Sequence, residues 1–387
     1  MSWSYRLATV RGIDLKVHAT FALIVAIAAA NWAGLGLAGM AFGATLILLL
    51  FACVTLHEFG HALAAQYYGI PVKEIVLLPI GGIAFLGRPT RHPMQELVIA
   101  AAGPAVNVAI VAILLPLLYL LDEPFHLAPA FLHPQAEALT FGEALRWLVS
   151  ANVSLVLFNM IPAFPLDGGR ILRGALGLWF DWPRATRWAT RTGQVLAVGM
   201  GAWGLLTGQL MLLVVAALIF FSASSTQIEE RAHGVLSTRF VGDACNRHAI
   251  ALNEHDRLST VTRYLLSSYQ PDFAVLRGND LLGVVRRAQV MQALASQPND
   301  PLVTAIMTSV PAVRADWTLA ATRSLLAESE VPVAAVYGGY GYIGLVSLED
   351  LVEAEAVLHF AEAGLRVSGA DDGWRAYRHA AIRPSEG

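Results

Sequence analysis

The segment HEFGH, residues 57–61, lies near the end of an apolar run over residues 40–66. No charged residue occurs between positions 40 and 56. Positions i and i+4 share one face of an α-helix, so His57 and His61 can direct imidazole nitrogens at one metal ion. Two imidazoles and a carboxylate are costly on a helix within a bilayer unless they are paired, hydrated or metal-bound. The segment therefore predicts a metal site inside an apolar helix.

Glu58 follows His57 by about 100° around such a helix, which lets it reach a water at the metal without being a ligand. This arrangement is typical of the H-E-x-x-H motif of zinc metalloproteases, with the glutamate as the catalytic carboxylate. The alternative is a pair of core histidines that match a short pattern by chance. The uncharged run before the motif favours the metal.

The composition predicts a multi-pass integral membrane protein with a more polar C-terminal part. Of 387 residues, 56% are hydrophobic and 14% charged, and the mean hydropathy is +0.55. A formal net charge of −3 gives no basic field for a nucleic-acid partner. The two cysteines, Cys53 and Cys245, lie in different regions, which excludes a disulfide framework.

Apolar runs predict a transmembrane domain over residues 1–225 with about six helices: 19–37, 40–67, 97–121, one from 141, and two within 188–221. Alternation over residues 5–20 predicts a short hairpin at the membrane surface. Between residues 70 and 86, Pro71, Pro79 and the Gly81-Gly82 pair exclude a helix and favour a β-like hairpin or loop dipping into the membrane. Two prolines, Pro162 and Pro165, break the fourth helix.

The basic residues that flank these helices predict the orientation. They fall on the side of the N-terminus, while the opposite side has only Arg146, at the start of the fourth span, and carries Asp122, Glu123 and Glu137 in its one long loop. By the positive-inside rule, the N-terminus and the C-terminal part are cytoplasmic. HEFGH then lies toward the cytoplasmic leaflet of the cell membrane.

A catalytic zinc ion generally takes three protein ligands, so one more is needed. Asp122 and Glu123 are predicted on the far side of the membrane. Asp167 follows the break in the fourth helix, at about the depth of His61, and is favoured as the ligand. Two alternatives stay open: Asp167 caps the helix that begins at residues 168–170, or His18 is the ligand.

Three segments together resemble the site-2 protease family of intramembrane zinc metalloproteases: HEFGH, GPAVN at residues 103–107 and FNMIPAFPLDGGR at residues 158–170. The resemblance implies one Zn²⁺ on His57, His61 and Asp167, with Glu58 as the catalytic carboxylate. It assigns Asn159 to substrate or oxyanion binding. The alternative for Asn159 is a hydrogen bond to backbone freed by Pro162.

The resemblance also implies a substrate: a transmembrane helix of another protein, such as a membrane-anchored regulator, cleaved in regulated intramembrane proteolysis. Residues 76–85 match the family's β-like membrane loop, which offers its edge to an extended peptide. The closest branch carries a C-terminal pair of CBS domains.

The polar C-terminal part contains an internal repeat of about 60 residues. After a linker at 226–236, residues 262–266 and 282–285 of one copy (237–297) match residues 322–326 and 343–346 of the other (298–361). Two copies of strand–helix–strand–strand–helix are similar to a tandem CBS pair. Residues 362–387 are expected to form a partly ordered tail.

In CBS pairs an aspartate after the last strand can hold a nucleotide ribose, which points to Ser347 and Asp350. The first copy has Arg286 and Gln289 at those places, so we expect at most one adenine-nucleotide site. The alternative is a module for homodimerisation or scaffolding that has no ligand.

The predicted function is thus an intramembrane zinc metalloendopeptidase, regulated by a nucleotide at the CBS pair. Two alternatives come from other classes. One is a CBS-regulated ion channel or transporter, in which the polar membrane residues form an ion path. The other is a non-catalytic membrane scaffold.

Overall fold

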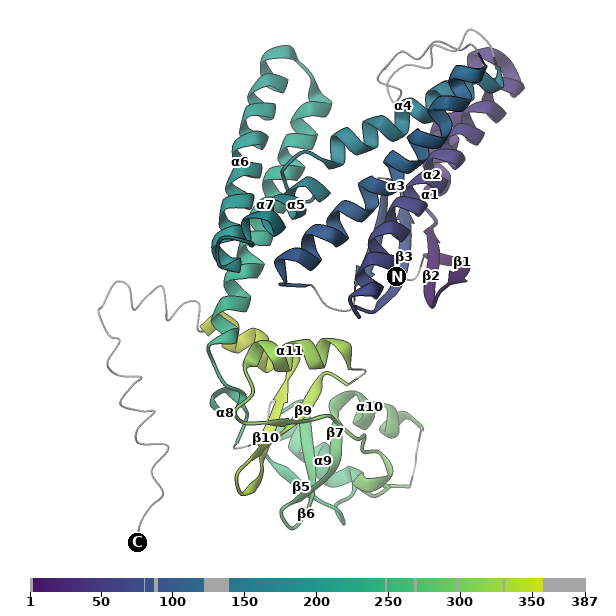
Figure 1. Cartoon of the computed structure of the whole chain (residues 1–387). Coiled ribbons are helices and arrows are strands. Elements are labelled where there is room, and N and C mark those ends of the chain that lie inside the picture. The colour runs from purple at the N-terminus through teal and green to yellow at the C-terminus, as the bar shows by residue number, and fades with distance from the viewer. Residues whose placement is uncertain are drawn as a thin grey trace. The chain divides into compact units, whose positions relative to one another are not determined.

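The computed structural model describes residues 3–79, 81–86, 90–121, 139–247, 249–267, 270–296, 299–329 and 331–357 (Figure 1). The chain divides into two compact units, Met1–Glu230 and Arg231–Gly387. The predicted tail at 362–387 and the loop containing Asp122, Glu123 and Glu137 lie outside the described residues.

The first unit is mainly helical. Its helices are α1 (Phe21–Asn31), α2 (Gly36–Tyr67), α3 (Pro93–Leu120), α4 (Phe141–Asn159), α5 (Asp167–Leu176), α6 (Trp182–Thr207) and α7 (Leu210–Ser237). Within the described residues, four helices are long and apolar enough to cross a membrane: 33–67, 93–120, 141–159 and 210–237. Of the other two predicted spans, α1 is apolar but has only 11 residues, and α6 begins with an arginine-rich turn. The chain is an integral membrane protein.

The predicted break in the fourth helix lies between α4 and α5. Pro162 and Pro165 have no N–H to continue the helical hydrogen bonds of α4, which ends at Asn159. A Cβ on Gly168 would lie 2.4 Å from the carbonyl oxygen of Ile161, and one on Gly169 would lie 2.6 Å from Ala163. Glycine at these two positions therefore lets α5 start close against the irregular segment.

A four-stranded sheet lies beside the helices, in the order β1 (Ser4–Val10), β2 (Ile13–His18), β3 (Val72–Leu78), β4 (Gly81–Leu86). β1–β2 and β3–β4 are antiparallel hairpins, as the sequence predicts for each segment. The parallel pairing of β2 with β3, which joins the hairpins, was not predicted. Ile13 and Ile75 are fully buried on the face that packs against α2 and α3.

The second unit contains the predicted repeat. After the short α8 (Val241–Ala244), the first copy has β5 (Ala251–Asn253), α9 (Leu258–Ser267), β6 (Asp272–Arg277), β7 (Asp280–Arg286) and α10 (Arg287–Ser296). The 3-10 turn η2 (Val303–Ala305) leads to the second copy, which has β8 (Ala312–Arg314), α11 (Leu319–Glu328), β9 (Val333–Gly338), β10 (Gly341–Ser347) and a helix at 348–357. Each copy forms one three-stranded sheet, and buried residues such as Ala274 and Ala335 join the two in one core.

The segment predicted as a linker, residues 226–236, is helical. It forms the last turns of α7, and the division between the two units falls within it. Leu236 is fully buried in the core of the second unit. The polar residues of the segment, among them Glu229, Glu230 and Arg231, are good helix formers, so the helix of the last span continues through them.

Candidate metal centre

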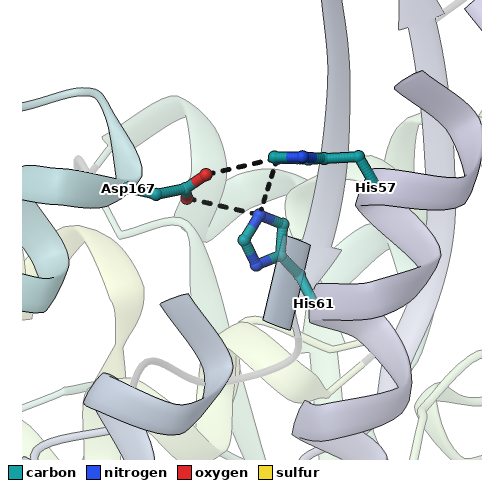
Figure 2. Close-up of side chains that lie close together, drawn as sticks. All are labelled: His57, His61 and Asp167. Carbon is teal, nitrogen blue, oxygen red and sulfur yellow. Dashed lines mark hydrogen bonds and ion pairs between the residues drawn. The ribbon is translucent and has the colours of Figure 1, made fainter. Parts of the chain in front are cut away.

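Figure 2 shows His57 and His61 from α2 converging with Asp167 from α5. The Nε2 atoms of the two histidines are 3.0 Å apart. Asp167 places Oδ2 at 3.2 Å from Nε2 of His57 and Oδ1 at 3.3 Å from Nε2 of His61. All three side chains are buried, and no other group of three or more His, Cys, Asp or Glu residues within the described ranges could hold a metal.

These separations fit a tetrahedral zinc ion. Zinc–nitrogen and zinc–oxygen bonds of about 2.0–2.1 Å place two ligand atoms about 3.3 Å apart along each edge of the tetrahedron. His57, His61 and Asp167 would take three vertices of such a tetrahedron and leave the fourth for a water or a substrate oxygen. The residues present fit the metal that the motif predicts.

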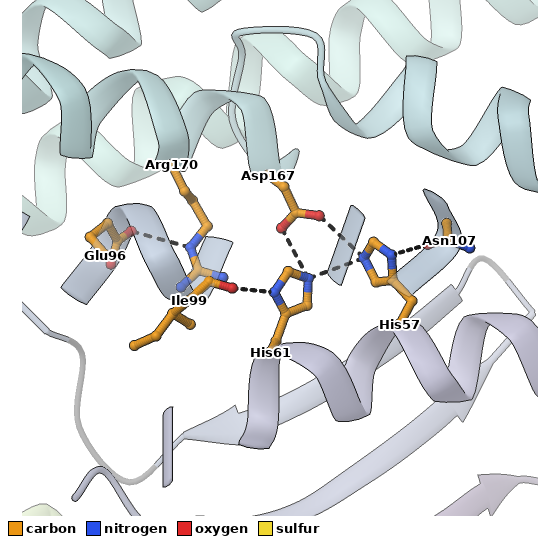
Figure 3. A network of polar contacts seen from close by, with 7 residues as sticks. All are labelled: His57, His61, Glu96, Ile99, Asn107, Asp167 and Arg170. Carbon is orange, nitrogen blue, oxygen red and sulfur yellow. Dashed lines mark hydrogen bonds and ion pairs between the residues drawn. The ribbon is translucent and has the colours of Figure 1, made fainter. Parts of the chain in front are cut away.

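Hydrogen bonds orient both imidazole rings (Figure 3). Nδ1 of His61 donates to the carbonyl oxygen of Ile99 at 2.7 Å, and Nδ1 of His57 donates to Oδ1 of Asn107. Both acceptors place the proton on Nδ1, so each Nε2 presents a lone pair to the other and to Asp167. Such an arrangement of lone pairs is repulsive without a cation at its centre.

A second amide fixes the orientation of Asn107. Nδ2 of Asn107 donates to Oδ1 of Asn152 at 2.7 Å, and Nδ2 of Asn152 donates to the carbonyl oxygen of Leu148 at 2.9 Å. Both asparagines are fully buried. The chain of bonds runs from α4 through α3 to α2, so three helices together determine the tautomer of His57.

Glycines allow α3 to lie directly against the motif. A Cβ on Gly103 would lie 2.2 Å from Nε2 of His61 and 2.7 Å from Nε2 of His57. A Cβ on Gly60 would lie 2.7 Å from the carbonyl oxygen of Ala102. Any side chain at Gly103 would therefore displace the imidazoles from their present positions.

Asp167 is the first residue of α5, and the N-cap is Leu166, which makes no side-chain capping bond. The carboxylate of Asp167 faces the two histidines. The alternative prediction, that Asp167 caps this helix, is therefore wrong. Glu96 of α3 anchors the same helix: its Oε1 accepts from Arg170 at 3.2 Å and from Arg173 at 2.6 Å. Only 2% of Glu96 is exposed. This buried ion pair fixes α5, and with it Asp167, against α3.

The edge strand β4 passes beside Glu58. A Cβ on Gly82 would lie 2.5 Å from Cγ of Glu58 and 3.3 Å from its Oε1. Within the described strands, β4 pairs with β3 alone, so its other edge has no strand partner there. The side chain of Glu58, the residue directly after His57, therefore lies against the backbone of an edge strand.

The remaining predicted residues lie elsewhere. His18, the alternative ligand, is on β2, where its Nδ1 contacts Oγ1 of Thr20 at 2.8 Å. Asn159 ends α4 and is half-buried, and none of the described hydrogen bonds joins it to a metal-site residue.

Ser347 and Asp350 bond to each other. Oδ2 of Asp350 accepts from N of Ser347 at 2.7 Å and from Oγ at 2.8 Å, while N of Asp350 donates to Oγ of Ser347 at 3.0 Å. This is a capping box at the start of the helix at 348–357. In the first copy, Oε1 of Gln289 accepts from N of Arg286 at 2.9 Å in the same way.

Sequence reasoning assigned no role to Asn107, Asn152 or Glu96. GPAVN contains Asn107, but its contact with His57 depends on how α3 packs on α2. The S-x-x-D spacing of Ser347 and Asp350 was a readable signal for a capping box. A single glutamate such as Glu96, in the first turn of an apolar helix, gave no signal of its partners.

Two family models match the chain. The model of peptidase family M50 matches residues 45–200, which contain HEFGH, GPAVN and Asp167, and the CBS domain model matches residues 303–357. The chain belongs to the site-2 protease family, in the branch with a C-terminal CBS module, and the members it resembles are described as zinc metalloproteases.

Three relatives show how far the likeness extends. A zinc metalloprotease of Methanocaldococcus jannaschii is 35% identical over 227 residues, which are 58% of this chain and 60% of that protein. Rip3 of Mycobacterium tuberculosis is 28% identical over 343 residues, or 83% of this chain and 82% of that one. The solved site-2 protease from M. jannaschii is 33% identical, covers 58% of this chain and 95% of its own, and superposes with a TM-score of 0.42. The match thus spans about 60% of the first relative's length.

Proposed function

We propose that this protein is an intramembrane zinc metalloendopeptidase that hydrolyses peptide bonds of transmembrane helices near the cytoplasmic leaflet. The observation that carries the proposal is the cluster of three buried side chains, His57, His61 and Asp167, whose ligand atoms contact one another at 3.0–3.3 Å, next to Glu58 in the motif. An ion channel needs a path for ions, whereas these three side chains converge on a single point, as the ligands of a catalytic zinc ion do. A non-catalytic scaffold needs neither the metal site nor the adjacent carboxylate.

Each residue then has a role in hydrolysis. His57, His61 and Asp167 would hold the zinc ion, which when bound polarises the scissile carbonyl and makes a water molecule more acidic. Glu58 accepts the proton of the attacking water and delivers it to the leaving amine. Asn159 stays a candidate for binding substrate or the oxyanion.

The substrate helix has to unwind before cleavage, because helical peptide bonds are shielded and freed backbone groups need partners within lipid. The free edge of β4 can supply them by strand addition. The contact between Gly82 and Glu58 supports this role, since a peptide paired with β4 would run beside the proposed base.

The proposed orientation places the N-terminus, the loop after α2 and the CBS module in the cytoplasm. Its support is the positive-inside rule, applied to a list of basic residues at the helix ends that includes Arg6, Arg11, Lys16, Lys73, Arg170, Arg173, Arg184, Arg187 and Arg191. The parallel pairing of β2 with β3 gives further support. β2 precedes α1 and β3 follows α2, so the chain enters and leaves this pair of helices on the same side.

The CBS module is proposed to regulate cleavage by binding one adenine nucleotide, with Ser347 and Asp350 as candidate contacts. A nucleotide there would have to share Asp350 with the capping box. Homodimerisation through this module is the second proposed role, and the two are compatible. Nucleotide titration against cleavage rate tests the first, and the mass of the full protein in nanodiscs tests the second.

The decisive experiment replaces Glu58 with Gln in the full chain. We expect Glu58→Gln to retain one zinc per chain and to lose cleavage of a reporter transmembrane helix by about 10²-fold or more. Glu143→Gln, which alters an ion pair with Arg146 within α4, is the matched control and should retain both. Cleavage at the wild-type rate by zinc-loaded Glu58→Gln would overturn the mechanism, and a wild-type protein free of zinc would overturn the metal site.

A further inference from the structure

We propose that the apolar face of β1, formed by Trp3, Tyr5 and Val10, rests in the headgroup region of the bilayer and fixes the depth of the sheet that borders Glu58. The proposed contact with lipid does not depend on whether the protein is a protease. Its consequence for where a substrate is cut rests on the proposed function.

Register assigns the two faces of the hairpin. Residues directly opposite each other in an antiparallel pair share a face. Tyr5 lies opposite Val17, and Val10 lies opposite Ile13. Val17 and Ile13 pack in the core between the sheet and the helices, so Tyr5 and Val10 lie on this same face of the sheet. Trp3, two residues before Tyr5, has its carbonyl oxygen bonded to N of Ala19 and extends the same row.

The opposite face of the sheet is charged. Arg6 lies opposite Lys16 and Thr9 opposite Asp14. Asp14 accepts from Thr9 at 2.6 Å and pairs with Arg6 at 3.7 Å, and Lys16 forms an ion pair with Glu74 of β3. The sheet is thus amphipathic, with one face suited to water and the other to an apolar surface.

The apolar face is covered only in part. Over β2 and β3 the helices α2 and α3 cover it, fully at Ile13 and Ile75 and in part at Leu15 and Val17. Over β1 the same face is open: Trp3 is 67% exposed, Tyr5 70% and Val10 46%. β1 therefore continues the buried face beyond the edge of the protein core.

The position of α1 identifies the occupant of this face as lipid. β2 ends at His18 and the apolar helix α1 begins at Phe21, so the connection spans less than about 10 Å. The sheet is thus tied at that distance to the end of a helix whose residues are nearly all apolar. Trp and Tyr are the side chains that favour this interface, and Arg11 in the hairpin turn is available to anionic headgroups.

The depth of β1 determines the depth of β4. The strands β1 to β4 form one hydrogen-bonded sheet, and β4 contacts Glu58 at Gly82. An anchor at the outer edge therefore fixes the height at which a peptide added to β4 meets the proposed base. The apolar face of β1 would thus act as a ruler, meaning that its depth in the bilayer determines which peptide bond of the substrate is cut.

Spin labels on adjacent residues test the lipid contact in the full chain, reconstituted in nanodiscs that contain anionic phospholipid. Tyr5→Cys and Arg6→Cys label opposite faces of one strand, and the buried Cys53 and Cys245 of the wild type give the background. We expect the ratio of collision rates with oxygen over a water-soluble nickel chelate to be about threefold or more higher at position 5 than at position 6. Equal ratios, or a higher one at position 6, would overturn the proposal.

The ruler is tested by mapping the bonds cut in a reporter helix. In the double variant Trp3→Ser, Tyr5→Ser we expect cleavage to spread from one bond to its neighbours, while Arg6→Ser should keep the wild-type bond. A lipid-facing label at position 5 with an unchanged cleavage site would overturn the ruler and leave the lipid contact standing. Absence of wild-type cleavage would overturn the proposed function and not the label result.

Discussion

Nδ1 of His57 is bonded to the amide oxygen of Asn107, a residue fifty positions later on another helix. This contact determines which nitrogen of the imidazole carries a proton, and thus which one faces Asp167. Partners of this kind hold a ligand in its binding orientation before the metal arrives. The metal centre is therefore assembled by the packing of α3 on α2 as much as by HEFGH itself.

The first prediction concerns this contact. Asn107→Ala removes the acceptor that holds the proton on Nδ1 of His57, so zinc affinity should fall about 10–100-fold. Asn152→Ala leaves Asn107 in place and should lower zinc affinity only a few-fold. Competition with a fluorescent chelator measures both. Equal affinity in Asn107→Ala and wild type would show that the bond does not position the ligand.

A second prediction follows from the close approach of Gly103 to the imidazoles. Gly103→Ala would place a Cβ within 2.7 Å of both Nε2 atoms, so the protein should lose most of its bound zinc and its cleavage activity. Gly199→Ala, on α6 with nothing within 4 Å, is the matched control and should keep both. Metal analysis of the two purified variants is the measurement. A zinc-replete Gly103→Ala would contradict the geometry.

The third prediction concerns the buried ion pair between α3 and α5. Glu96→Gln leaves Arg170 and Arg173 without their carboxylate, and it should lower the free energy of unfolding by about 3 kcal/mol. Glu143→Gln removes a more exposed pair and should cost less than about 1 kcal/mol. Thermal unfolding in detergent compares the two variants. Similar losses would mean that Glu96 does not anchor α5.

The fourth prediction is a pH dependence in the CBS module. Burial, with the charges of Asp350 and Glu349 acting in the same direction and Arg286 opposing them, raises the pKa of Asp272 from 3.8 to about 6. The folded state therefore favours the protonated carboxyl, and this residue's contribution to stability is present below about pH 4 and lost as the pH rises through 6.

Asp272→Asn should accordingly stabilise the module by about 1–2 kcal/mol at pH 7.5, and by much less at pH 4.5. Amide hydrogen exchange of β6 in the full chain, at both pH values, gives the comparison. A stabilisation that is the same at the two pH values would show that the charge of Asp272 is not its source.

Much of this arrangement was predictable from local patterns. Histidine spacing placed His57 and His61 on one helix face, and the two prolines located the break before Asp167. Alternation located the hairpin at residues 5–20, and prolines and glycines that exclude a helix located the one at residues 70–86. These features depend on residues near one another in the chain. The pairing of β2 with β3 does not, because it joins segments separated by two helices, and neither does the contact of Asn107 with His57.

The interpretation of residues 226–236 as a linker shows a different limit. Their polarity marks the end of a span, but polarity does not distinguish a flexible connection from helix that has left the membrane. Helix propensity, which was high there, was the better guide. Likewise, the Ser347 and Asp350 pattern suited both a nucleotide contact and a helix cap, and in the structure the two residues form the cap.

The parallel pairing of β2 with β3 also dictates an order of events during synthesis. β2 leaves the ribosome before α1 and α2, while its partner β3 follows them. One edge of the N-terminal hairpin therefore stays unpaired until α1 and α2 have been synthesised and the chain has returned to the same side. The sheet beside Glu58 is completed only after HEFGH has been synthesised, so the nascent protein acquires the free edge of β4 after the helix that carries its two histidines.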